Sequence, residues 1–155
     1  MGFLRNQGML DGLNTVSSVD YDADLSVVVV RTKTETSFED KLKKKTRTSG
    51  CAVGTVFGDM MEGLEGLKLP ASSLRISWLY DLSNKINQTP SLYLAAGAIH
   101  GTVLCKQNQA LVYMEDVGRH NAVDKIAGWM ASNDVSGSDK ICLLYTSPSP
   151  RDLRE

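Results

Sequence analysis

Tyr113-Met-Glu-Asp-Val-Gly-Arg-His-Asn-Ala-Val-Asp-Lys125 is the stretch that decides the fold of this 155-residue chain. Up to Asp116 it reads as a β-strand that ends in two adjacent carboxylates. After Gly118, apolar residues recur at helical spacing, which predicts an α-helix. A glycine at position 118 would permit a sharp turn that a residue with a Cβ would resist. The stretch therefore predicts a strand, a tight turn and a helix in succession, and we expect an α/β fold.

The predicted turn also gathers polar side chains, which makes it a candidate binding site. A loop that leads from the end of a strand into a helix is where α/β folds place ligands, and the first amides of the helix favour an anion. The residues alone allow a second interpretation: a solvated helix start, in which Asp116 or Asn121 is a cap and Arg119 pairs with a carboxylate. The polar residues of the turn are Glu115, Asp116, Arg119, His120, Asn121 and Asp124.

Three stretches together resemble one family. Glu115-Asp-Val-Gly-Arg-His-Asn-Ala-Val-Asp-Lys125 resembles the signature of the formate dehydrogenase accessory sulfurtransferases, the FdhD family. Thr48-Ser-Gly-Cys-Ala-Val-Gly54 is similar to the reactive-cysteine loop of that family. Gly97-Ala-Ile-His-Gly-Thr-Val-Leu104 is similar to its Gly-Gly-x-His-Ala-Ala-Ala-Leu stretch. The resemblance extends over nearly all of the chain from Gly2 to Ile141.

Composition excludes several classes of function. The chain is 42% hydrophobic and its net charge is −1, so it has no general attraction for nucleic acid or anionic membranes. No apolar run is long enough to span a bilayer, and we recognise no signal peptide. The three cysteines, Cys51, Cys105 and Cys142, are odd in number and not clustered like metal ligands. We therefore expect a cytoplasmic protein with no metal site and with neither nucleic acid nor membrane as a partner.

Cys51 is the candidate nucleophile. It follows the basic run Lys41–Arg47 and lies between Gly50 and Gly54. Basic neighbours lower the pKa of a thiol, and the thiolate is the nucleophilic form. The residues alone favour an incidental loop cysteine beside a solvated charge run, whereas the resemblance favours a reactive one. Many family members carry Cys-x-x-Cys here; because Gly54 takes the second position, any mechanism must use Cys51 alone.

Other segments predict supporting elements. The valine run in Leu25–Thr34 indicates a strand buried on both faces. A helix is expected to begin at Leu69–Ser73, with Pro70 in its first turn, and to end at Asn87–Pro90. Its apolar stripe is more consistent with core than with a cofactor site. The stripe consists of Leu74, Trp78, Leu79, Leu82 and Ile86.

A β-hairpin is predicted next, formed by Ile99–Cys105 and Ala110–Met114. His100 stands at its start. A lone histidine there is more often a hydrogen-bonded structural group, but the resemblance makes His100 a site candidate. Cys105 lies among apolar residues and is expected to be an inert core thiol.

We expect three segments along the chain. Residues 1–68 form a β-rich N-terminal part that carries the Cys51 loop. Residues 69–142 form a partial cytidine-deaminase-like α/β domain, as the resemblance implies. Residues 143–155 depart from the family and look like a translated sequencing adapter, so we expect a non-native tail. The start of the chain resembles an internal part of the family. We therefore expect a fragment that is incomplete at both ends, and the unpaired sheet edge of such a fragment favours association with other chains.

The resemblance implies a sulfurtransferase that acts as a sulfur carrier. It would accept sulfur from a cysteine desulfurase as a persulfide on Cys51. It would pass that sulfur to the molybdenum bis-molybdopterin guanine dinucleotide cofactor of formate dehydrogenase, bound as a substrate. A homodimer is compatible with the resemblance. The residues implied to bind the cofactor are His100, Glu115, Asp116, Gly118, Arg119, His120 and Asn121.

Two alternatives come from other classes of protein. A zinc deaminase needs His or Cys ligands and a glutamate two residues after the first of them. His100 is followed by Gly101 and Thr102, and the chain has no Pro-Cys-x-x-Cys, which disfavours this class. The second alternative is a non-catalytic chaperone that binds the molybdenum cofactor, and the missing second cysteine keeps it open.

Overall fold

The computed structural model describes residues 1–10, 15–35, 45–48, 54–57, 68, 73–92, 95 and 99–145. The chain divides into two compact units, Met1–Lys68 and Leu69–Glu155. Helices and strands are mixed along the chain, and every described strand pair is antiparallel. The expectation of mixed helix and sheet is confirmed. A parallel sheet of the kind that places ligands at the carboxyl ends of its strands is not what the described strands form.

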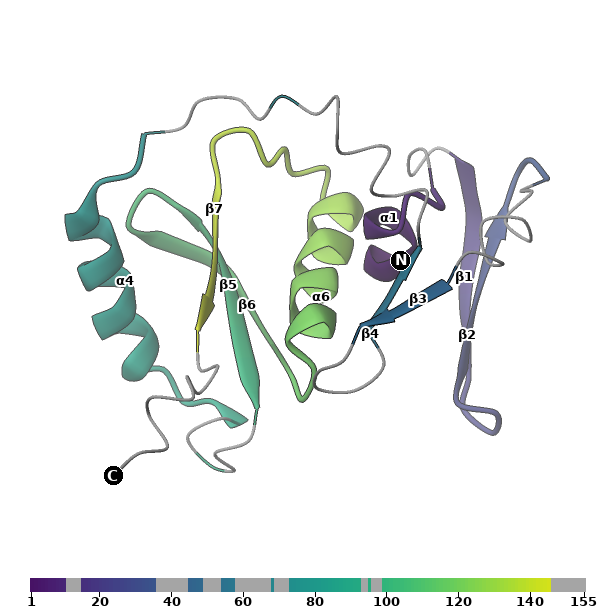
Figure 1. Ribbon diagram of the computed structural model, residues 1–155, viewed down its shortest axis with the longest axis horizontal. Helices are drawn as coiled ribbons and strands as arrows, with labels where there is room; N and C mark the ends of the chain where they lie inside the picture. The colour runs from purple at the N-terminus through teal and green to yellow at the C-terminus, as the bar shows by residue number, and fades with distance from the viewer. Residues whose placement is uncertain are drawn as a thin grey trace. The chain divides into compact units, whose positions relative to one another are not determined.

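The first unit contains a short helix and two β-hairpins. Helix α1 spans Gly2–Asn6. Strand β1 (Val16–Asp22) pairs with β2 (Val27–Thr32). Strand β3 (Lys45–Thr48) pairs with β4 (Gly54–Phe57). Both pairs are drawn as ribbons in Figure 1. Each pair is a separate two-stranded sheet.

The valines of β2 are exposed, which corrects our expectation that this strand is buried on both faces. Val27, Val28 and Val29 are 45%, 55% and 38% exposed. Within the described residues β2 pairs with β1 alone, and a two-stranded sheet covers little of either face. The high β-propensity of valine predicted the strand correctly but did not determine its burial.

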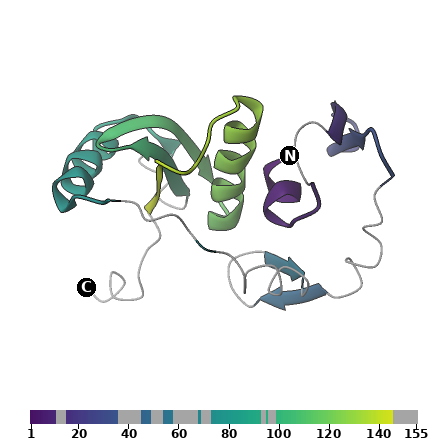
Figure 2. The same ribbon diagram turned by 90° about the horizontal axis from the view of Figure 1, so that it is seen from above.

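The second unit is a three-stranded sheet between two helices. Strand β5 (His100–Lys106) is central, with β6 (Gln109–Asp116) on one side and β7 (Ile141–Tyr145) on the other. Helix α4 (Ile76–Asn87) covers one face of the sheet, and helix α6 (Arg119–Ser132) covers the other (Figure 1). The view from above in Figure 2 shows the same order of layers.

The core of this unit is built on β5, where every residue from His100 to Cys105 is buried. Because successive side chains of a strand point to opposite faces, β5 serves both helices. Thr102 and Leu104 lie on the face that α6 covers, where Ala122 and Ile126 of that helix are buried. The buried cluster on the face of α4 consists of Leu82, Ile86, Val103 and Cys105.

The hairpin and the helix after Gly118 form where the sequence predicted them, whereas α4 begins later than expected. Its first residue is Ile76, and Arg75 before it is extended. Leu74, which we placed in the apolar stripe, is 51% exposed. Residues 69–72 of the expected start lie outside the described residues. A helix is stabilised mainly by packing of its apolar face, and Leu74 lacks that packing. The end of α4 at Asn87 agrees with the prediction.

Strand β7 crosses the boundary at which we expected the native sequence to end. It begins at Ile141 and continues through Tyr145. Leu143 pairs with Val103 of β5 and packs against the core of the unit. Residues 143–145, which we assigned to a non-native tail, are therefore part of the sheet. The rest of that segment lies outside the described residues.

Candidate functional site

The strand, turn and helix form as predicted, and they bring most of the expected site residues to one end of the sheet. Strand β6 ends at Asp116, and α6 begins at Arg119 with Gly118 as its N-cap. The first helical hydrogen bond runs from the Ala122 amide to the Gly118 carbonyl, at 3.1 Å. His100 is the register partner of Asp116 across the hairpin. The sheet thus places His100 beside the turn.

Asp116 is the centre of the turn. Its Oδ1 accepts hydrogen bonds from the Gly118 amide at 2.9 Å and from Asn121 Nδ2 at 3.2 Å. Its Oδ2 pairs with Lys125 Nζ at 2.7 Å. Burial opposes ionisation of Asp116, but the hydrogen bonds from Lys125, Gly118 and Asn121 outweigh it and hold the pKa of the carboxyl below its usual range. Both oxygens of this carboxylate are occupied within the chain. No side chain caps α6, however, and its N-cap is Gly118, so the interpretation of Asp116 or Asn121 as the cap is wrong.

Glu115 faces the other side of the sheet. Its Oε1 accepts a hydrogen bond from the Tyr113 hydroxyl at 2.7 Å, and its Oε2 accepts one from the Leu92 amide at 3.0 Å. Neighbouring residues of a strand point to opposite faces, so the carboxylates of Glu115 and Asp116 are separated by the sheet. The structure therefore does not bring the Glu115 carboxylate together with the other residues of the turn. Instead, this carboxylate links β6 to the segment after α4.

Lys125 belongs to the turn, although our list of site residues omitted it. Its ammonium donates to the Glu115 carbonyl oxygen at 2.7 Å in addition to its pairing with Asp116. The spacing of Asn121 and Lys125, four residues apart on α6, places both side chains on one face of the helix. That spacing was the signal in the sequence that could have identified Lys125.

Gly118 does not have the role that the sequence suggested. Its φ of −105° is accessible to any residue, so the turn does not need the conformational freedom of glycine. A Cβ at this position would lie 3.1 Å from Asn121 Nδ2 and 3.6 Å from Asp116 Oδ1. The contact with Asp116 would be an ordinary one, whereas the Asn121 side chain would have to shift by a few tenths of an ångström to make room for a Cβ.

Arg119 and His120 project from the first turn of α6 into solvent. In the part of the chain that the structure describes, neither makes a hydrogen bond or an ion pair, so Arg119 is not paired with a carboxylate as one interpretation proposed. The helix amides nearest to them have no partner within the helix, as in any α-helix. The turn thus presents a guanidinium, an imidazole and backbone donors on one surface.

His100 is the buried member of the group. It is 8% exposed, and its Nδ1 has no hydrogen-bond partner among the described residues. Leaving a buried polar atom unpaired costs about 1–3 kcal/mol, and such an atom calls for an explanation. A ligand that reached the end of β5 would supply the missing partner. The exposed donors of the turn and this unpaired nitrogen fit an anionic ligand that carries hydrogen-bonding groups.

Cys51 lies outside the described residues. The strands on either side of it are described: β3 and β4 are antiparallel, and Thr48 is the register partner of Gly54. Cys51 therefore falls in the connection between two paired strands.

The two described cysteines have raised thiol pKa values. Cys105 is fully buried, and its burial together with the nearby Cys142 raises its pKa to about 11. This confirms Cys105 as a core residue. Cys142 lies at the surface on β7, yet the packing around its thiol also raises its pKa. Neither thiol favours the thiolate near neutral pH.

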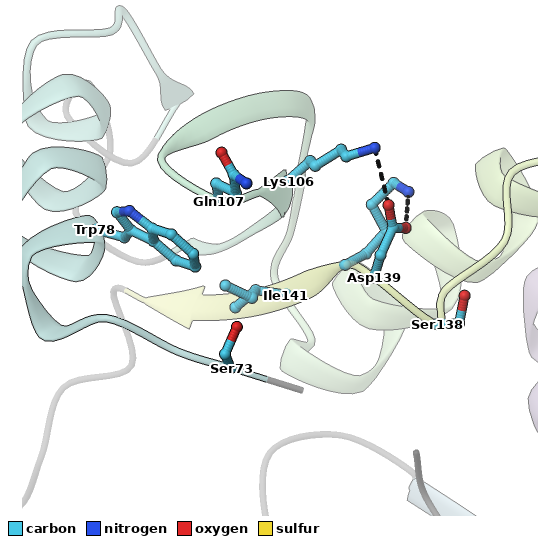
Figure 3. Close-up of a pocket in the computed structure, with 8 residues that line it drawn as sticks. Ser73, Trp78, Lys106, Gln107, Ser138, Asp139 and Ile141 are labelled. Carbon is cyan, nitrogen blue, oxygen red and sulfur yellow. Dashed lines mark hydrogen bonds and ion pairs between the residues drawn. The ribbon is translucent and has the colours of Figure 1, made fainter. Parts of the chain in front are cut away.

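A hollow of about 330 Å³ lies at the opposite end of the sheet, beside the turn between β5 and β6. Figure 3 shows Trp78 on one side of it and Lys106 reaching toward Asp139. Asp139 pairs with Lys106 at 2.9 Å and also with Lys140, and these contacts lower its pKa to about 2. Both lysines that line this hollow pair with its one carboxylate, Asp139, and none of the predicted site residues lines it.

Among the residues that the structure describes, no three His, Cys, Asp or Glu side chains come together as a metal site would require. No described helix combines the length and apolar character needed to cross a membrane.

The second unit is a mixed helix-and-sheet structure, in which an antiparallel sheet lies between two helices. Its polar strand–turn–helix, at one end of the sheet, is a candidate anion site. The chain belongs to the FdhD/NarQ family, whose sequence pattern matches residues 1–148. This confirms the resemblance carried by the three motifs.

Related proteins are similar to the chain over most of its length. The sulfur carrier protein FdhD of Wolinella succinogenes is 31% identical over 131 residues, which cover 83% of this chain and 45% of the relative. The protein of the same name from Bacillus subtilis is 27% identical over 147 residues, which cover 93% and 56%. The chain thus spans about half the length of the curated relatives it matches.

One solved structure has a similar fold. It belongs to a candidate formate dehydrogenase accessory protein from Desulfotalea psychrophila. The TM-score is 0.65 at 22% sequence identity, and the match covers 92% of this chain and 51% of that one. At this identity the likeness concerns the fold alone.

Proposed function

We propose that this chain is a sulfur carrier that passes sulfur from a cysteine desulfurase to the molybdenum bis-molybdopterin guanine dinucleotide cofactor of formate dehydrogenase. The observation that carries the proposal is family membership over residues 1–148, with relatives that are named sulfur carrier proteins. The cysteine content is typical of a protein in a reducing compartment, which supports sulfur transfer in the cytoplasm.

Cys51 is the proposed acceptor of the sulfur. Its thiolate attacks the outer sulfur of the persulfide on the desulfurase. A sulfur–sulfur bond forms at Cys51, the bond within the donor persulfide breaks, and the donor cysteine leaves as a thiolate with the electron pair. The exchange needs no oxidant. The high pKa of Cys105 supports the choice of Cys51, because a buried neutral thiol is a poor nucleophile.

The turn at the start of α6 is the proposed cofactor site. The cofactor is anionic through its phosphates, and Arg119, His120 and the first amides of α6 offer donors for anions. The unpaired Nδ1 of His100 lies at the same end of the sheet and offers a hydrogen bond to a polar group of the ligand. The fit supports binding of a phosphate-bearing molecule.

Persulfide mapping tests the proposal. After incubation with a cysteine desulfurase and free cysteine, we expect one additional sulfur atom on Cys51, identified by mass spectrometry of peptides under non-reducing conditions. Cys51→Ala should abolish this adduct, and Cys105→Ala should retain it. Cys51→Ala should also fail to support formate dehydrogenase in cells that lack their own sulfur carrier.

A non-catalytic cofactor-binding chaperone is the second candidate. It is favoured by one observation: Gly54 stands where many family members carry the second cysteine. If the extra sulfur appears on another cysteine, or if Cys51→Ala still supports formate dehydrogenase, the chaperone is the better description.

Two finer expectations belong to the same proposal. We infer that the second unit is part of a cytidine-deaminase-like core, because a sheet covered by a helix on each face is compatible with it. We also propose a homodimer as the active form. A high-resolution structure of a full-length relative tests the first inference, and sedimentation equilibrium of this chain tests the second, since a monomer at all concentrations would contradict it.

A further inference from the structure

We propose that Lys125 and Asp116 are positioning residues that hold the strand-to-helix turn in the form that receives the ligand, and that Arg119 and His120 contact the ligand. The inference rests on the proposed function of the turn. It separates two roles that the motif alone does not distinguish.

The contacts of Lys125 connect three parts of the turn. One ammonium group binds the backbone at Glu115 and the side chain of Asp116, both at 2.7 Å, from the second turn of α6. The last residues of β6 are thereby fixed to the helix that follows them. Through the other oxygen of Asp116, the same network reaches the Gly118 amide.

The packing leaves little freedom in this network. Gly118 is buried, and a Cβ at this position would lie only 3.1 Å from Asn121 Nδ2. Because Asn121 Nδ2 also binds Asp116, the first turn of α6 is set by the Asp116 carboxylate. Arg119 and His120 lie between Gly118 and Asn121, so the position of this first turn determines the direction in which their side chains project.

The charges support the same division of roles. The negative charge of Asp116 is offset by Lys125, so neither of these residues adds net charge to the surface. Arg119 and His120 are exposed and unpaired among the described residues, so their donors are available to an anion. Loss of Lys125 would free the end of β6 and leave the Asp116 carboxylate uncompensated next to the proposed anion site.

The test compares Lys125→Met with Lys85→Met in the full chain. Lys85 is a matched control, because its ammonium donates to the Asn108 carbonyl oxygen at 2.9 Å at the other end of the sheet. Guanosine diphosphate serves as the probe, and its affinity is measured by isothermal titration calorimetry. Exchange of the Gly118 amide is measured by NMR on the free proteins.

We expect Lys125→Met to weaken guanosine diphosphate binding at least tenfold and to accelerate exchange of the Gly118 amide at least tenfold. Lys85→Met should change each quantity less than twofold. A Lys125→Arg variant, which keeps a cation with several donors, should recover most of both losses. A role in stability alone would lower the folded fraction without changing the affinity of the folded protein.

The outcomes distinguish the inference from the proposed function. Weaker binding in Arg119→Ala with unchanged binding in Lys125→Met overturns the inference and leaves the proposed function intact. Weaker binding in Lys125→Met without faster Gly118 exchange also overturns it, since Lys125 would then contact the ligand directly. If the parent chain does not bind the probe, the proposed function of the turn fails, and the inference that rests on it fails as well.

Discussion

Asp116 holds three donors at once, and its protonation state therefore affects the whole turn. Protonation would remove the ion pair with Lys125 and weaken the hydrogen bonds from Gly118 and Asn121. Because the folded chain keeps the pKa of Asp116 low, the unfolded chain binds this proton first as the pH falls. The stability that the ionised group provides is complete above the pKa of an unfolded aspartate, about 3.9, and is lost below it.

Asp116→Asn should remove this dependence on pH. As the pH falls below about 4, the free energy of unfolding should fall more steeply for the parent chain than for the variant. Urea unfolding at a series of pH values measures the difference. Parallel curves for the two proteins would show that Asp116 is not held by its partners as described.

Arg119 and His120 are the residues on which binding at the turn depends. Arg119→Ala and His120→Ala should each weaken binding of a guanosine nucleotide. Both side chains are exposed and make no hydrogen bond or ion pair with the described residues, so each change should cost less than about 0.5 kcal/mol of stability. Calorimetric titration together with thermal melts checks both quantities. Unchanged affinity in both variants would remove the turn from the ligand site.

At the scale of elements, β2 and β5 are both rich in apolar residues but differ in what covers them. The valines of β2 are exposed, whereas Leu104 of β5 is 2% exposed. Leu104→Ala should therefore lower the free energy of unfolding by about 2–5 kcal/mol, through lost burial and the cavity it leaves. Val28→Ala should change it by about 0.5 kcal/mol or less. Denaturant unfolding measures both, and a large loss in Val28→Ala would show that β2 is covered.

Elements whose signal is local could be predicted from the sequence. The hairpin of β5 and β6 and the helix α6 are encoded by alternation and by helical spacing, and both formed as expected. The burial of β2 and the start of α4 could not be predicted, because both depend on which other parts of the chain pack against them. A valine run has the same propensity in a covered sheet and in a bare hairpin.

In the candidate site, too, the local features could be predicted from the sequence and those that depend on packing could not. The motif identified the turn, because polar residues before a helix act through short distances along the chain. The expected side-chain cap was wrong, since the N-cap of α6 is Gly118 and Asp116 binds the Gly118 amide instead. The opposite orientations of the Glu115 and Asp116 side chains follow from the pleat of β6, once that strand is placed. The role of Lys125 depends on how α6 lies over the sheet, and three-dimensional packing was needed to see it.

At the scale of the molecule, the described strands of the two units differ in how much of their side-chain surface is buried. Strand β5 is buried along nearly its whole length between two neighbouring strands. Within the described residues, β1 and β2 form a sheet of two strands with mostly exposed side chains. We expect the amides of β5 to exchange with solvent at least about a hundredfold more slowly than those of β1 and β2.

Hydrogen exchange followed by NMR or mass spectrometry measures this contrast. Exchange should be slowest at Val103 and Leu104, which lie at the centre of the sheet. Equal protection of the two units would contradict the expectation, because it would mean that they open as one cooperative body.

The order of strands in the second unit has a consequence for how the chain acquires its structure. Strands β5 and β6 are joined by a two-residue turn, and a hairpin of this kind forms within about 1–10 μs. Strand β7 pairs with the other side of β5, but α6 and the loop after it separate the two strands along the chain. The central strand therefore keeps one open edge early in folding, and contacts between distant parts of a sequence form more slowly. During that interval the unpaired side of β5 is exposed to pairing with another molecule.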